Sequence, residues 1–130
     1  MNTRLLMRAS ALVLGAVGLA ATFLPQEILA GAGAPSVPAA VVIVQIVGAT
    51  YLGFAFLNWM AQGNAIGGVY SRPVAVANFG HFTIGGLALL KSGLMTQNAL
   101  PMLAGGAVYA VFAALFAYVA FGYSPAARSG

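Results

Sequence analysis

Four long apolar stretches constrain the fold of this chain more than any other feature. They cover about residues 5–24, 38–60, 73–90 and 99–122, and a helix needs roughly 20 mostly apolar residues to cross a bilayer. Pro38, Pro73 and Pro101 lie in expected first turns, where a missing N–H costs a helix little. We therefore predict an all-α protein whose four transmembrane helices form a bundle of antiparallel hairpins, a single transmembrane domain over residues 1–130.

The composition agrees with a membrane protein. Of the 130 residues, 62% are hydrophobic and 5% are charged, whereas soluble domains carry roughly 25% charged residues. A soluble monomer is therefore excluded. The first stretch, with Arg4 and Arg8, also has features of a secretory signal peptide, but its apolar run is long for one, and we favour a spanning helix.

The basic residues predict an orientation. Four of the five would lie on one side of the membrane if both termini were cytoplasmic: Arg4, Arg8, Arg72 and Arg128. Only Lys91 would then lie outside, as the positive-inside rule favours. We expect Trp59, Tyr70 and Arg72 near the inner boundary, in contact with lipid headgroups or a partner protein.

Few chemical groups are available for catalysis. Glu27 is the only carboxylate side chain, His81 is the only histidine, and cysteine is absent. Paired-carboxylate hydrolysis, a Ser-His-Asp triad and a metal site built by one chain all need more such groups. The basic residues are scattered, so they do not form a nucleic-acid footprint. We predict no enzyme activity, no catalytic residue and no metal centre.

Polar side chains inside the spans need hydrogen-bond partners, because lipid offers none. They are Gln45, Thr50, Asn58, Asn78, His81 and Thr83, and the candidate binding site lies among them. Asn78, His81 and Gly85 are spaced i, i+3 and i+7, so they share one helical face, which we expect to point into the bundle. Counting helix rise places Thr50 and Tyr51 at the height of His81. If the second and third helices are neighbours, His81 bonds one of these two residues and ties the helices together.

A bound ligand is the other interpretation of this group. Asn78, His81, Thr50 and Tyr51 could offer polar contacts to a quinone or a lipid. Ala77 and His81 also have the A-x-x-x-H spacing of bacterial light-harvesting helices, which would make His81 an axial ligand of a chlorophyll-type pigment or a haem. The sequence requires no cofactor.

Small residues predict the packing faces. We expect Ala49 and Gly53 to form a small-xxx-small contact between helices, and Gly63 and Gly93 to follow helix ends. The segment "EIL" from Glu27 could form one short helical turn. Long apolar residues should face lipid or a partner protein: Leu87, Leu90, Phe112 and Phe116.

The motifs "TFLPQEIL", "LGFAFLNWM" and "YSRPVAVANFGHF" together resemble small bacterial four-helix membrane proteins of the DoxX-like kind. The resemblance implies a multi-pass protein of the bacterial inner membrane and transfers no catalytic residue. We expect a non-catalytic accessory subunit that packs against other integral membrane subunits of a respiratory or photosynthetic complex. The alternatives are a binding protein for a small apolar molecule and, less favoured, a transporter or lipid-modifying enzyme.

Overall fold

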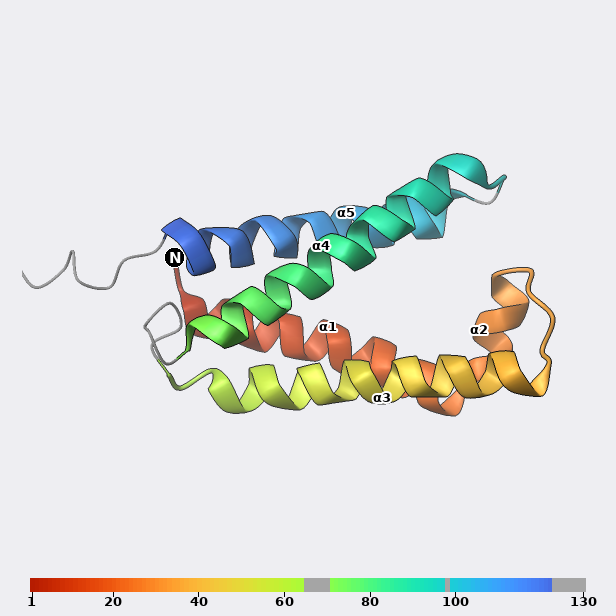
Figure 1. Ribbon diagram of the computed structural model, residues 1–130, viewed down its shortest axis with the longest axis horizontal. Helices are drawn as coiled ribbons and strands as arrows, with labels where there is room; N and C mark the ends of the chain where they lie inside the picture. The colour runs from red at the N-terminus through yellow and green to blue at the C-terminus, as the bar shows by residue number, and fades with distance from the viewer. Residues whose placement is uncertain (65–70, 98, 123–130) are drawn as a thin grey trace, which may run out of the picture. The chain divides into compact units, whose positions relative to one another are not determined.

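The computed structural model describes residues 1–64, 71–97 and 99–122, and this part of the chain contains helices and no strand. The elements are α1 (Thr3–Phe23), α2 (Pro25–Gly31), α3 (Pro38–Ala61), α4 (Arg72–Met95), α5 (Ala99–Ala117) and a short π-helix, η1 (Tyr118–Gly122) (Figure 1). Within these residues, four helices are long and apolar enough to cross a membrane: α1, α3, α4 and α5 continued by η1. The predicted all-α chain with four membrane-length helices is confirmed.

The helix starts follow local sequence signals. The side chain of Asn2 accepts a hydrogen bond from the backbone N–H of Leu5 at 3.2 Å and so caps α1. Proline stands in the first turn of three further helices, as Pro25 in α2, Pro38 in α3 and Pro73 in α4. The "EIL" segment lies in α2, which is longer than the single turn expected for it.

The predicted end of the third spanning helix at residue 90 is wrong, because α4 continues to Met95. Gly93, expected to follow the helix end, lies inside it. A Cβ atom at Gly93 would stand 2.8 Å from the side chain of Leu103 in α5. This glycine therefore allows α5 to approach α4 instead of ending the helix.

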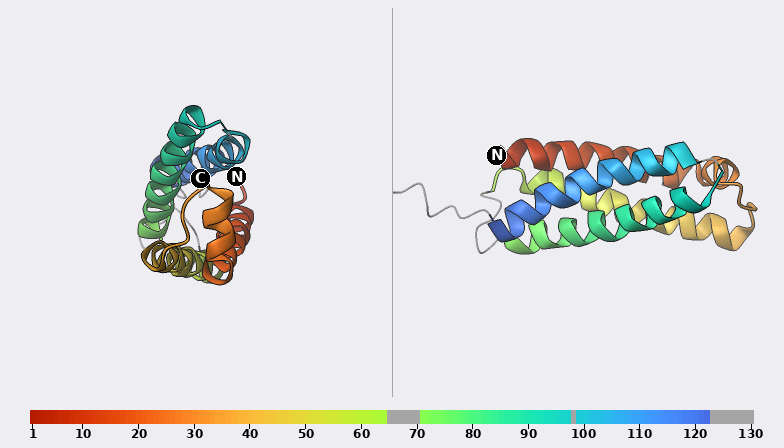
Figure 2. Two further views of the ribbon diagram at one scale, coloured as in Figure 1. Left: turned by 90° about the vertical axis from the view of Figure 1, so that its right-hand side faces the viewer. Right: turned by 90° about the horizontal axis from the view of Figure 1, so that it is seen from above.

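Contacts within the chain define two compact units, residues 2–62 and the residues from 63 onward. We call them the α1–α3 unit and the α4–α5 unit and describe each by itself. In the first, α1 packs along α3, and α2 touches both helices (Figure 1). In the second, α4 packs along α5 and also contacts η1 (Figure 2).

Glycines bring α1 and α3 close together. A Cβ at Gly18 would lie 2.9 Å from the backbone nitrogen of Leu52, and one at Gly48 would lie 2.8 Å from that of Thr22. The contact with α1 therefore uses Gly48 and not the predicted Ala49–Gly53 pair. A Cβ at Gly53 would meet no other atom of the described chain within 4 Å.

Aromatic rings fill the contact between α4 and α5. Phe82 is fully buried, and its ring centroid lies 4.8 Å from that of Phe112 and 5.7 Å from that of Phe116. The expectation that Phe112 and Phe116 face lipid is wrong, because both are buried. Gly86 lets α5 approach closely, since a Cβ added at this glycine would stand 3.1 Å from the Cβ of Tyr109. The two rings therefore stack on Phe82 instead of meeting lipid.

Two further leucines were expected at the lipid surface. Leu87 is exposed, as expected. Leu90 is only partly exposed, because its side chain lies over Gly106 of α5, where an added Cβ would stand 2.7 Å away. A glycine on the facing helix thus decides which long side chains are drawn into the contact.

Candidate functional site

A buried polar pair joins α1 to α3. Ser10 and Asn58 are both fully buried, and the Asn58 Nδ2 donates to Ser10 Oγ at 3.0 Å. Ser10 Oγ in turn donates to the carbonyl of Met7 at 3.0 Å. Sequence reasoning marked Asn58 as a residue that needs a partner but missed Ser10. A signal was available, because Ser10 lies about two turns after the start of α1 and Asn58 about one turn before the end of α3, and these two helix ends meet in the predicted antiparallel hairpin.

Other polar side chains of this unit bond backbone carbonyls. Thr22 Oγ1 donates to Gly18 O at 2.8 Å, and Thr50 Oγ1 donates to Ile46 O at 3.0 Å. Gln45 Nε2 reaches across to Thr22 O at 3.4 Å. Thr50 was predicted to contact a ligand, but its hydroxyl group donates its proton to a carbonyl of its own helix.

The predicted stripe of Asn78 and His81 lies in the α4–α5 unit. Asn78 is fully buried, and its Nδ2 donates to Val74 O at 2.9 Å. The His81 ring is partly buried, with its centroid 5.3 Å from that of Phe82 and 5.8 Å from that of Tyr109. His81 thus belongs to the aromatic contact between α4 and α5, which sequence reasoning did not foresee. Thr50 and Tyr51 lie in the other unit, so their contact with His81 stays a prediction.

A small cavity of about 170 Å³ lies beside this stripe. Phe82, Thr83 and Gly86 of α4 line it together with Ala110 and Ala113 of α5. Thr83 Oγ1 is buried and has no hydrogen-bond partner among the described residues. Pockets for organic ligands usually measure about 300–1,000 Å³, so this cavity is too small for a quinone or a pigment.

Arg72 closes the end of the α4–α5 unit. Its Nε donates to the carbonyl of Ala120 in η1 at 3.0 Å. The last carbonyls of a helix lack partners within the helix, and a basic side chain can satisfy them. Arg72 therefore has a structural contact in addition to its predicted place at the membrane interface. Tyr70, predicted beside it, lies outside the described residues.

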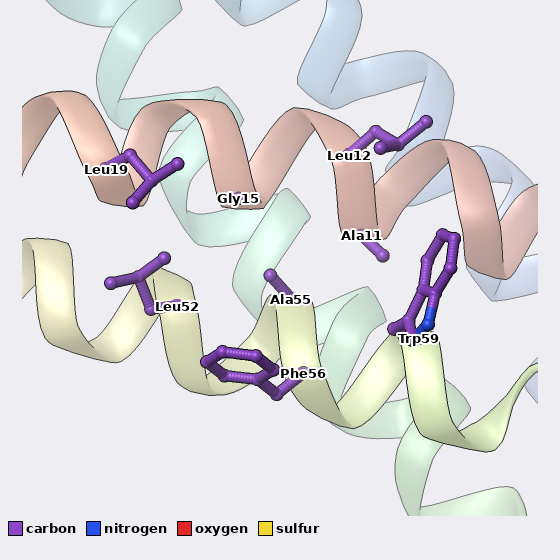
Figure 3. Close-up of a pocket in the computed structure, with 8 residues that line it drawn as sticks. All are labelled: Ala11, Leu12, Gly15, Leu19, Leu52, Ala55, Phe56 and Trp59. Carbon is purple, nitrogen blue, oxygen red and sulfur yellow. The ribbon is translucent and has the colours of Figure 1, made fainter.

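A groove of about 340 Å³, larger than the cavity in the α4–α5 unit, lies between α1 and α3 (Figure 3). From α1 it is lined by Ala11, Leu12, Gly15 and Leu19, and from α3 by Leu52, Ala55, Phe56 and Trp59. Ala11 and Ala55 are buried at its base, whereas Leu12, Leu19, Phe56 and Trp59 beside them are exposed. Sequence reasoning placed Trp59 at the membrane boundary but did not find this groove.

The described residues offer little for chemistry. They contain no group of three or more histidine, cysteine or acidic side chains that could hold a metal ion. No family model matches the chain, and no curated protein or solved structure matches it either. The function is therefore argued from the helices, the groove and the exposed faces alone.

Proposed function

We propose that this protein is a non-catalytic accessory subunit that packs against a larger membrane complex. The exposed surface of α3 carries the proposal. Among the 18 most apolar consecutive residues of α3, only 6% are buried, whereas 39% are buried in the corresponding stretch of α1. Ile43, Ile46 and Met60 are among the exposed residues of α3. A face this apolar needs lipid or another membrane protein to cover it.

Ala49 and Gly53 favour a protein helix on this face. Both are exposed, and their i, i+4 spacing puts them on one side of α3. Helices in lipid gain little from hydrophobicity, so they associate where small residues let two backbones approach closely. Because α1 contacts Gly48 instead, the Ala49–Gly53 pair lies outside the contact between α1 and α3, and we assign it to a helix of another subunit.

The proposal includes a finer architecture. The four spanning helices form a bundle of two antiparallel hairpins with both termini in the cytoplasm, in the inner membrane of a bacterium. The hydrogen bonds from Arg8 to Gln62 and from Gln45 to Thr22 support one such hairpin. The distribution of basic residues supports the orientation. A DoxX-like relationship and a respiratory or photosynthetic partner belong to the same proposal.

Native purification in mild detergent, followed by mass spectrometry, tests the subunit role. A matched pair of variants, Gly53→Ile and Gly80→Ile, adds the same side chain at two glycines where a Cβ meets nothing within 4 Å in the described chain. We expect a stoichiometric membrane partner with the unaltered protein and with Gly80→Ile, and its loss with Gly53→Ile. A wild-type chain that purifies alone, or equal recovery with both variants, contradicts the proposal.

A ligand held by Asn78 and His81 has less support, because the Asn78 amide bonds Val74 and the His81 ring packs in the aromatic contact. A visible absorption spectrum of the purified chain tests the pigment and haem forms of that alternative. A chromophore band lost in a folded His81→Leu variant would favour it over the subunit role.

A further inference from the structure

The groove between α1 and α3 leads toward a basic membrane boundary. Arg8 precedes Ala11 by three residues and Leu12 by four, so it lies on the groove side of α1, one turn nearer the helix start. Its Nε donates to the Oε1 of Gln62, and Gln62 Nε2 donates to the carbonyl of Trp59 at 2.7 Å. These bonds hold the Arg8 guanidinium at the Trp59 end of the groove.

The charge at this end lies far from the chain's only acidic side chain. Arg4 and Arg8 are both exposed and lie one helical turn apart, so their like charges repel each other. Glu27, the only carboxylate side chain, lies in α2, beyond the far end of α1. No acidic side chain lies at this end of α1, so an anionic lipid headgroup complements this pair of arginines.

The groove has the chemistry of a lipid tail and spans about two thirds of the depth of one leaflet. From Leu12 to Leu19 it follows α1 for about 10 Å, and one leaflet of the hydrocarbon core is about 15 Å deep. Small side chains form its base, and Leu19 and Phe56 stand exposed beside it (Figure 3). Trp59 lies two residues before the end of α3, at the level where interfacial tryptophans meet headgroups.

We propose that this groove binds one acyl chain of an anionic phospholipid, whose headgroup contacts Arg8, the arginine nearer the groove. Bulk lipid tails compete for the same apolar surface, so the groove alone gives no preference among lipids. The selection comes from the headgroup. One arginine close to the phosphate corresponds to a roughly fivefold preference for an anionic over a zwitterionic lipid.

Trp59 is the only tryptophan and lines the groove, so its fluorescence reports on lipid in and beside the groove. The protein is reconstituted into phosphatidylcholine vesicles that contain the same small fraction of either dibrominated phosphatidylglycerol or dibrominated phosphatidylcholine. Bromine on an acyl chain in the groove quenches Trp59. We expect the anionic lipid to reach half-maximal quenching at a roughly fivefold lower fraction than the zwitterionic lipid.

Two charge variants complete the test. Arg8→Gln and Lys91→Gln each remove one positive charge, the first at the groove and the second in α4. Arg8→Gln should abolish most of the preference, and Lys91→Gln should retain it. Equal quenching by the two lipids in the unaltered protein overturns the proposal. Absence of Trp59 quenching by either lipid, as when a helix or a second copy covers the groove, also overturns it. An equal loss of the anionic preference in Arg8→Gln and Lys91→Gln does the same.

Discussion

The close approach of α1 and α3 at Gly48 gives the sharpest stability prediction. A Cβ added there would stand 2.6 Å from Thr22 Oγ1, 2.8 Å from Thr22 N and 3.0 Å from the backbone carbon of Ala21. Because two of these atoms belong to the backbone, rotation of a side chain cannot relieve the contact. Ordinary contact needs at least 3.4 Å, so Gly48→Ala must push the helices apart by roughly half an ångström.

Gly53→Ala is the matched control, since it makes the same change five residues later, where a Cβ meets nothing within 4 Å in the described chain. Alanine improves helix propensity by up to about 1 kcal/mol in both variants, whereas overpacking costs about 1–3 kcal/mol. We expect Gly48→Ala to be about 2 kcal/mol less stable than Gly53→Ala. Unfolding by SDS in mixed micelles, followed by Trp59 fluorescence, measures the difference. Equal stability of the two variants would refute the close contact.

Three further predictions follow from buried contacts. Asn58→Leu removes the hydrogen bond to Ser10 and should lower the free energy of unfolding by about 1 kcal/mol. If a double-mutant cycle with Ser10→Ala gave a coupling free energy of zero, it would argue against that bond. Phe116→Ala should cost about 2 kcal/mol, less than in a soluble core because the unfolded helix keeps the ring in lipid; an unchanged SDS midpoint would place the ring at the lipid surface. Arg72→Gln frees the carbonyl of Ala120 and should speed hydrogen exchange of the backbone amides in residues 118–122. Unchanged protection of these amides would show that the bond does not hold η1.

The helices could be predicted from sequence because apolar length and proline position act locally. The starts of α3 at Pro38 and α5 at Ala99 match the predicted positions, and that of α4 lies within one residue. The end of α4 was missed because Gly93 was taken as a terminator. A glycine ends a helix or admits a neighbouring one, and the choice depends on Leu103, ten residues away in the sequence.

Which face of each helix is covered could not be predicted. Phe116 and Leu87 are both long apolar residues, yet only the first is buried. Gly48 and Gly53 look alike in the sequence, and only the first contacts α1. In lipid both faces of a helix are apolar, so hydrophobic patterning does not mark the packed side. For the candidate site, the sequence identified three polar residues inside the spans: Asn58, Asn78 and His81. The roles of Ser10 and Tyr109, and the groove, became visible only in the structure.

Sided labelling of single cysteines most directly tests the central claim that this chain crosses the membrane four times with both ends inside. The sequence has no cysteine, so each introduced thiol is the only one. Positions Asn2, Gln26, Gln62 and Thr96 lie at or near helix ends. In intact cells, a membrane-impermeant maleimide should label Gln26→Cys and Thr96→Cys, whereas Asn2→Cys and Gln62→Cys should react only after lysis. Labelling of Asn2→Cys from outside, or of Gln26→Cys and Thr96→Cys from opposite sides, would contradict the account.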